Sequence, residues 1–213
     1  HMDFVRPVEA VVPGVQGRVL GALARVEVGL PLSTLARVAG VSRARTTQVV
    51  DQLAALGIVT RQGAGRAVLV RLERDNVAGR AVQDLAGLEA IVLRRLRLLA
   101  RSIRPAPVTL AVFGSFARGE ATADSDLDLL AGRPFGADNS DEWTNSVGRF
   151  TRRASVLTGN PANVLEYSES EIRERLADAN ADSPGAELWR SILADAVELA
   201  GVPLHKLVND SAR

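Results

Sequence analysis

The feature that most constrains the fold is a short hydrophobic segment near the middle of the chain that ends in two small residues. Residues 108–113 read VTLAVF, which predicts a buried β-strand that leads directly to Gly114 and Ser115. Glycine permits a ligand to approach the backbone closely, and serine offers a hydroxyl group. A helix that starts here would direct its free N–H groups toward an anion. The segment therefore indicates a phosphate-binding turn.

Two carboxylates follow on a second predicted strand. Residues 125–130, SDLDLL, alternate polar and apolar side chains, so Asp126 and Asp128 are expected on one face of the strand and leucines on the other. Neighbouring carboxylates repel each other, and a divalent cation relieves that repulsion. Mg²⁺ (or Mn²⁺) suits the pair because it takes a few carboxylate ligands together with substrate phosphates. The alternative is an exposed edge strand that carries solvated acids.

Residues 108–130 resemble the DNA polymerase beta-type nucleotidyltransferase superfamily, especially its small MNT-like proteins. The shared motif is a hydrophobic strand, Gly-Ser, a spacer and Asp-hydrophobic-Asp. The resemblance implies a mixed sheet flanked by helices, which binds a nucleoside triphosphate and transfers a nucleotide. The roles that it implies are triphosphate binding for Gly114, Ser115 and Arg118, and catalytic metal binding for Asp126 and Asp128.

Active members of this family carry a third acidic residue on a later strand, where it completes the metal site and often serves as the base. Here that strand is expected over residues 161–167, after a helix over 141–157, and the corresponding position is Asn163. Asparagine can coordinate weakly through its carbonyl oxygen but cannot take a proton at neutral pH. Glu166 could be the third ligand only if the strand bulges or shifts its register. The sequence therefore leaves transferase activity open.

The N-terminal part of the chain has a different pattern, with three helical segments and then two strands. Glycines at the ends of the helical segments and in the loop between the strands support these boundaries. The expected elements are a helix over residues 17–28, a short helix over 32–39, a helix over 43–56 capped by Ser42, and strands over 58–61 and 67–72.

This order of elements resembles the winged helix-turn-helix domains of MarR-like and ArsR-like regulators, over about residues 15–74. The resemblance implies that the third helix enters the major groove of DNA while the wing contacts phosphates. Such domains also serve as protein-interaction or dimerisation modules, which is the alternative. The residues expected to contact DNA are Arg43, Arg45, Thr46 and Gln48 on the helix, and Arg61, Arg66 and Arg71 on the wing.

The distribution of charge supports a basic partner for the first half of the chain. Residues 1–104 carry 16 arginines against 8 acidic residues, a net charge of +8, and residues 105–213 carry 10 basic against 17 acidic residues, a net charge of −7. Such asymmetry suggests that the basic half meets a polyanion such as DNA.

Residues 77–103 predict one long helix, which Arg104-Pro105-Ala106-Pro107 ends. The expected α+β organisation is therefore a winged helix-turn-helix domain over residues 1–76, a linker helix over 77–104 and an MNT-like domain over 105–213. The linker helix could form a homodimer or pack on either domain. In the C-terminal region, Ser168 and Glu171 predict a capping box, and residues 188–199 predict an amphipathic helix.

Composition restricts the setting and the metal chemistry. The chain has no cysteine, so a metal must be held by oxygen or by His1 and His205, and His205 lacks neighbours that would suggest catalysis. His1 and Met2 resemble the remnant of an expression tag. The absence of cysteine makes a cytoplasmic protein the expectation. No apolar run approaches the roughly 20 residues that span a bilayer, so we expect no membrane partner.

Two functions from different classes follow from these features. The first is a DNA-binding, Mg²⁺-dependent nucleotidyltransferase that acts on a protein hydroxyl, an RNA end or a small molecule. The second is a transcriptional regulator or antitoxin-like repressor whose degenerate transferase domain senses nucleotide or mediates dimerisation. Asn163 favours the second function, while a pure scaffold conflicts with both the motif and the charge distribution.

Overall fold

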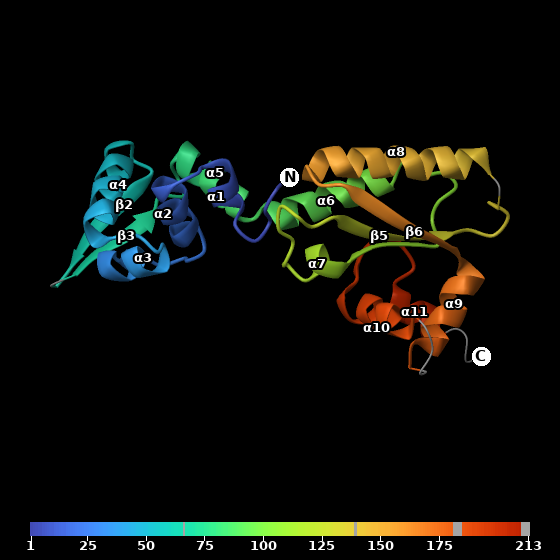
Figure 1. Cartoon of the computed structure of the whole chain (residues 1–213). Coiled ribbons are helices and arrows are strands. Elements are labelled where there is room, and N and C mark those ends of the chain that lie inside the picture. The colour runs from blue at the N-terminus through green and yellow to red at the C-terminus, as the bar shows by residue number, and fades with distance from the viewer. Residues whose placement is uncertain (66, 139, 181–184, 210–213) are drawn as a thin grey trace. The chain divides into compact units, whose positions relative to one another are not determined.

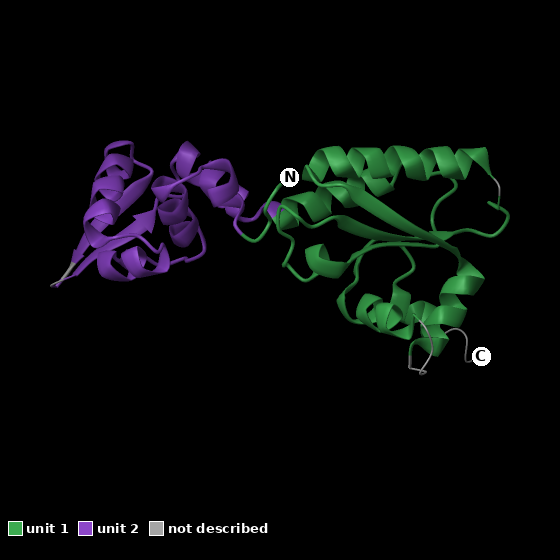
Figure 2. Ribbon diagram, viewed as in Figure 1, with its two compact units in different colours: residues 1–5, 89–213 green, residues 6–88 purple. Residues whose placement is uncertain are grey.

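The chain divides into two units, residues 6–88 and residues 89–213 together with residues 1–5 (Figure 2). The computed structural model describes residues 1–65, 67–138, 140–180 and 185–209. No helix among these residues is both long and apolar enough to cross a membrane.

The unit of residues 6–88 has the order of elements that the sequence predicts for a winged helix (Figure 1). Its three strands form an antiparallel sheet in the order β1-β3-β2, and β2 and β3 make the hairpin of the wing. The α+β class expected for the chain is confirmed. The elements are α1 (Pro7–Val11), α2 (Val15–Ala24), β1 (Leu30–Pro31), α3 (Leu32–Val38), α4 (Arg43–Ala55), β2 (Val59–Ala64), β3 (Ala67–Leu72) and α5 (Val77–Ala86).

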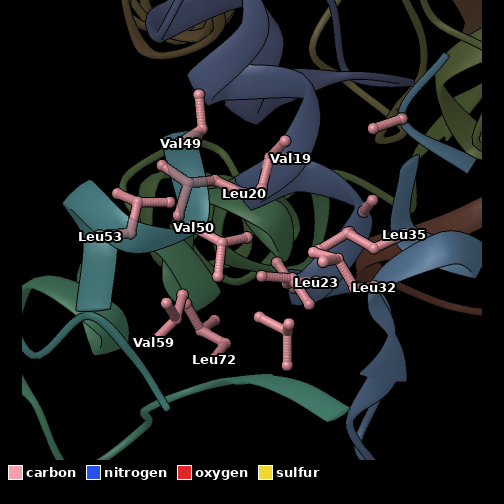
Figure 3. Packing of buried hydrophobic residues seen from close by; sticks show 14 of the residues in the cluster. Val19, Leu20, Leu23, Leu32, Leu35, Val49, Val50, Leu53, Val59 and Leu72 are labelled. Carbon is pink, nitrogen blue, oxygen red and sulfur yellow. The ribbon is translucent and has the colours of Figure 1, made fainter. Parts of the chain in front are cut away.

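One hydrophobic core holds these helices and strands together (Figure 3). Helix α4 begins at Ser42, whose side chain accepts a hydrogen bond from the backbone N–H of Arg45, as expected for an N-cap. Its buried side chains recur at helical spacing, so one face of α4 packs inward and the other stays available. The labelled core residues are Val19, Leu20, Leu23, Leu32, Leu35, Val49, Val50, Leu53, Val59 and Leu72.

The single long helix expected over residues 77–103 is wrong, because the structure has two helices there, α5 and α6 (Leu88–Ala100). Gly87 ends α5, and its backbone N–H donates to the carbonyls of Gln83 and Leu85. Glycine loses more conformational freedom in a helix than any other residue, which favours a break at this position. Helix α5 packs on α1 and α2, and the boundary between the two units falls beside Gly87.

The unit of residues 89–213 is built on a mixed sheet in the order β6-β5-β4-β7. Strands β5 and β6 are parallel, and β4 is antiparallel to both β5 and β7. The mixed sheet flanked by helices is therefore confirmed. The elements are α6, β4 (Thr109–Phe113), α7 (Gly114–Ala117), β5 (Leu127–Arg133), α8 (Asp141–Thr158), β6 (Ala162–Ser168), α9 (Glu169–Ala177), a 3₁₀ turn (Asp178–Asn180), α10 (Ala186–Asp195), β7 (Val197–Gly201) and α11 (Leu204–Asn209).

Helices cover both faces of this sheet (Figure 1). Helices α6 and α8 lie along one face, and α9, α10 and α11 pack on the other. The buried side chains Phe113 and Leu130 contribute to the second of these layers, together with Ile172 and Trp189. Because residues on a strand alternate between its faces, Asp128 shares the face of Leu130, at the edge of this core.

The C-terminal region agrees with the sequence prediction at its start and differs near its end. Ser168 and Glu171 form the expected capping box at the beginning of α9. The helix expected over residues 188–199 is correct only up to Asp195, because residues 197–201 form β7 and pair with β4. The partner strand, rather than local periodicity, decides the conformation of these residues.

Candidate functional site

The candidate site lies where β4 ends and β5 begins, and Gly114 allows the two strands to meet closely there. Gly114 has a φ of +72°, a conformation that side chains with a Cβ rarely adopt. A Cβ at this position would lie 2.8 Å from Oδ2 of Asp128. The absence of a side chain therefore brings the backbone of the turn against the carboxylate, and Ser115 follows with a partly exposed side chain.

Asp128 and Asp126 are close enough to influence each other. Asp128 sits in β5 opposite Phe113, and Asp126 directly precedes the strand. Partial burial raises the pKa of Asp128, and the negative charge of Asp126 raises it further. A cation between the two carboxylates would relieve both effects, so the local electrostatics suit a positively charged ligand.

Asn163 lies beside this pair. In the parallel pairing of β5 and β6, Asp128 is in register with Asn163. The Nδ2 group of Asn163 donates a hydrogen bond to Oδ2 of Asp126 at 3.0 Å. The structure thus brings the sequence-predicted residues Asp126, Asp128 and Asn163 together, with an amide as the third polar group.

Glu166 does not join them. It pairs with Ala131 in a register that runs without interruption from Leu127 to Arg133, so no bulge turns it toward Asn163. Instead its Oε2 accepts a hydrogen bond from Nε1 of Trp143 in α8, at 2.8 Å. Among the described residues, no group of three or more His, Cys, Asp and Glu side chains is placed to hold a metal ion.

Arg118, which the resemblance places near a phosphate, is engaged by two carboxylates. Its Nε donates to Oε2 of Glu120 at 2.8 Å, and its Nη1 donates to Oδ2 of Asp195 at 3.0 Å. Its hydrogen bonds to Glu120 and Asp195 raise the pKa of Arg118, so it remains charged. A phosphate would have to compete with these two acids for the guanidinium group.

Sequence reasoning missed Asn160, a buried residue that supports the loop before Asp126. Asn160 is 4% exposed, and its Nδ2 donates to the carbonyls of Ser125 at 2.7 Å and Thr122 at 3.3 Å. Asn160 also exchanges hydrogen bonds with the backbone of Met2. Its position after Gly159 in the sequence indicates only a turn, and nothing local reveals contacts with a loop more than 30 residues earlier.

Asn160→Ala is expected to lower the free energy of unfolding by about 2 kcal/mol, because it removes the hydrogen bonds that this buried side chain makes with the backbone of Met2, Thr122 and Ser125. Urea unfolding followed by circular dichroism measures this change. Asn145→Ala, at an exposed position of α8, is the matched control and should change stability by less than about 0.5 kcal/mol. Equal stability of the two variants would contradict a supporting role for Asn160.

Asp128→Asn is expected to raise the free energy of unfolding at neutral pH slightly, by about 0.5 kcal/mol, since water screens a partly exposed charge. The raised pKa of Asp128 means that its charged form costs stability above that pKa, and that the cost disappears as the pH falls through it. We also expect Mg²⁺ and ATP to raise the melting temperature of the wild type but not that of the variant.

Thermal melts with and without Mg²⁺ and ATP test both effects of Asp128→Asn. Asp124→Asn removes an exposed charge from the same loop and is the control. An Asp128→Asn protein that is less stable than wild type yet still gains stability from Mg²⁺ and ATP would contradict this role of Asp128.

In the winged-helix unit, three of the four α4 residues that the sequence predicts to contact DNA are exposed. Arg43, Arg45 and Gln48 are exposed on α4, and Nη1 of Arg45 donates to Oε1 of Gln48 at 2.6 Å. Thr46 is a correction: its side chain is 0% exposed, and its Oγ1 donates to the carbonyl of Ser42, so it cannot reach DNA. Its burial follows from spacing, because Thr46 lies on the same face of α4 as the core valines.

Two of the three wing arginines that the sequence predicts to contact phosphates lie beside acidic side chains. Arg61 is exposed but forms an ion pair with Asp51 of α4. Arg71 is exposed, and its Nη2 lies 3.4 Å from Oε2 of Glu73. Arg66 falls outside the described residues. A phosphate would therefore compete with acidic side chains for Arg61 and Arg71.

Comparisons with known proteins find a family match within each unit. Residues 12–67 match the family model described as MarR family, and residues 93–138 match the family model described as Nucleotidyltransferase domain. The second match contains Gly114, Ser115, Asp126 and Asp128, and ends before Asn163.

No curated protein matches the chain. A solved structure described as "Crystal structure of the toxin-antitoxin with AMP-PNP" is 13% identical and has a TM-score of 0.37, covering 56% of this chain and 83% of that chain. A likeness at that level indicates nothing about function. The two family matches and the observed elements agree that this chain joins a MarR-type winged helix-turn-helix domain to a nucleotidyltransferase domain.

Proposed function

We propose that this protein is a DNA-binding regulator whose nucleotidyltransferase domain binds a nucleoside triphosphate with a divalent cation but transfers the nucleotide slowly. The observation that carries the proposal is the hydrogen bond from Nδ2 of Asn163 to Asp126. A side chain that acts as hydrogen-bond donor occupies the place next to the two aspartates, where the resemblance implies an acid. The domain has the two aspartates and the Gly-Ser turn that would bind the cation and the triphosphate. It lacks the third carboxylate that would accept the proton of the acceptor hydroxyl.

The donor set fits Mg²⁺ (or Mn²⁺) bound together with a triphosphate. Asp126 and Asp128 would supply carboxylate oxygens. Burial, and after it the charge of Asp126, raises the pKa of Asp128, and a bound cation would favour the charged form of that carboxylate again. The bound ion would supply charge neutralisation for the phosphates. Gly114 lets the phosphate-bearing turn approach Asp128, since any Cβ there would collide with the carboxylate.

The weak step is the removal of a proton. In nucleotide transfer, the hydroxyl oxygen of the acceptor bonds to the α-phosphorus, the hydroxyl proton leaves, and pyrophosphate departs with the bond electrons. An amide cannot accept that proton at neutral pH. Glu166 is held by Trp143 and points away from Asn163, so it does not compensate.

Nucleotide transfer to an acceptor is the second candidate function. The proximity of Gly114 and Asp126 to Asp128 favours it, because two carboxylates beside a Gly-Ser turn are groups that would hold a cation and a triphosphate. An acceptor whose hydroxyl loses its proton readily, or one that brings its own base, could then react. A protein hydroxyl, an RNA end and a small molecule are the acceptor classes to test.

On the DNA side, the proposal rests on the exposed N-terminal part of α4. Arg43, Arg45 and Gln48 present donors suited to base edges and phosphates, while the opposite face of α4 is buried. A homodimer would present two copies of α4 to DNA, and two-fold symmetric DNA sites would be its expected consequence.

The experiment that tests the proposal combines DNA binding with nucleotide binding in the full chain. Fluorescence anisotropy should give a DNA affinity that changes when Mg²⁺ and a nonhydrolysable triphosphate are added. Asp126→Ala and Asp128→Ala should each abolish that change without altering DNA affinity in the absence of nucleotide. DNA affinity that is indifferent to nucleotide would contradict the regulatory part of the proposal.

A further inference from the structure

A hollow of about 650 Å³ lies between α6 and α8, within the unit of residues 89–213. Helices α6 and α8 cover one face of the sheet (Figure 1), whereas Asp128 shares the strand face of Leu130, which packs in the core with Ile172 of α9. The residues of this hollow that carry the argument are Arg95 and Leu98 of α6, and Arg149, Arg152, Arg153 and Val156 of α8.

The charge of the hollow is entirely positive. Four arginines line it and no acidic residue does. None of these four arginines takes part in an ion pair with any of the residues that the structure describes. In the same unit, Arg118, Arg133 and Arg173 each have a carboxylate partner. The hollow therefore gathers cations that the protein has not neutralised.

The same hollow exposes apolar side chains between the arginines. Leu98 is 57% exposed and Val156 is 86% exposed. Exposed apolar side chains that gather in one place and are rimmed by polar groups mark an interaction site, whereas single exposed apolar residues are common on any surface. A phosphate backbone would use the arginines but would gain nothing from Leu98 and Val156, so the chemistry favours a ligand that is both acidic and apolar.

The spacing of the residues indicates the shape of that ligand. On α8 the lining positions are 149, 150, 152, 153, 156 and 157, and on α6 they are 95, 98 and 99, with position 102 just beyond the end of the helix. Both sets contain the i, i+3, i+4 repeat of one helix face, and the α8 set spans roughly 12 Å. Two such stripes form a groove long enough for about two turns of a third helix.

We propose that this groove between α6 and α8 binds an acidic amphipathic helix of a partner protein. Leucine-type side chains of the partner would cover Leu98 and Val156, and flanking carboxylates would pair with the arginines. A second copy of this chain is a poorer occupant, because its acidic helix α9 already buries Ile172 and Leu176 in its own core.

The test uses the full chain and a fluorescein-labelled synthetic helix of about 18 residues, made of leucine and glutamate with the leucines at i, i+3, i+4 and i+7. A scrambled peptide of the same composition and a DNA duplex of random sequence are the comparison probes. Arg152→Glu/Arg153→Glu removes the charge, and Val156→Glu removes the apolar contact. Arg190→Glu, at an exposed position on α10, is the matched control.

We expect the amphipathic peptide to bind in a saturable manner and more tightly than its scrambled form. Each groove variant should weaken that binding by about tenfold or more, and Arg190→Glu should leave it within about twofold. Thermal melts should show that the variants fold, as expected for changes at exposed positions. Equal binding of the scrambled peptide would overturn the proposal. So would a loss of DNA affinity in the charge variant with no effect of Val156→Glu on peptide binding, which would indicate nucleic acid as the occupant.

Discussion

Asn163→Asp is expected to raise the rate of nucleotide transfer by about 100-fold or more, which is the contribution typical of a positioned general base. The substitution replaces the amide that donates to Asp126 with a carboxylate in register with Asp128. The new group can accept the proton of the incoming hydroxyl and add a ligand for Mg²⁺. Without metal, it adds a third negative charge to the pair and should lower the melting temperature.

Incorporation of label from α-³²P-labelled nucleoside triphosphates, with Mg²⁺ and candidate acceptors, measures this rate. Asn145→Asp introduces the same charge at an exposed position of α8 and should leave the rate unchanged. Asn163→Ala should be as slow as the wild type, because it removes the hydrogen bond without supplying a base. A rate for Asn163→Asp within about threefold of the wild type, together with unchanged Mg²⁺ affinity, would show that the third position does not limit the reaction.

The double variant Arg43→Ala/Arg45→Ala is expected to weaken DNA binding by about 100-fold, because single contacts of this kind contribute about 1–3 kcal/mol each. Both side chains are exposed near the N-terminus of α4, the end that a recognition helix presents to the groove. If either arginine binds a phosphate, the dependence of affinity on salt should also fall, by about one unit of slope for each phosphate that the variant no longer neutralises.

Anisotropy titrations over a range of salt concentrations measure both quantities, with duplexes selected by the wild-type protein from a randomised pool. Arg80→Ala, on α5, removes an exposed arginine away from α4 and serves as the control. DNA affinity within about twofold of the wild type for the double variant would contradict DNA recognition through α4. It would favour a protein-interaction role for the winged helix.

Local patterns predicted the elements whose conformation depends on neighbours in sequence. The alternation in residues 125–130 predicted β5, and Ser42 and Ser168 predicted the caps of α4 and α9. The register of β6 then followed, because an uninterrupted parallel strand brings Asn163 and not Glu166 to the carboxylates. The conformation of these features depends on interactions between residues that are close in the sequence, so it can be predicted from local patterns.

The sequence-based predictions are wrong or incomplete where contacts between distant residues determine the conformation, and at two positions where a local pattern already indicated the observed structure. Residues 197–201 form a strand because β4, almost 90 residues earlier, pairs with them. Asn160 supports a loop more than 30 residues earlier, and the residues around Asn160 in the sequence give no sign of that contact. Two other errors were avoidable. Gly87 marked the end of α5, and the helical spacing of Thr46 with Val49 and Val50 indicated that it is buried.

The most direct test of the proposed function measures, in one preparation of the wild-type protein, the equilibrium binding of labelled triphosphate and its covalent incorporation. We expect saturable binding that requires Mg²⁺ and that falls by about tenfold or more in Asp126→Ala and Asp128→Ala. We also expect incorporation far slower than that of Asn163→Asp under the same conditions. Absence of Mg²⁺-dependent binding, or wild-type incorporation as rapid as that of Asn163→Asp, would contradict the proposed function.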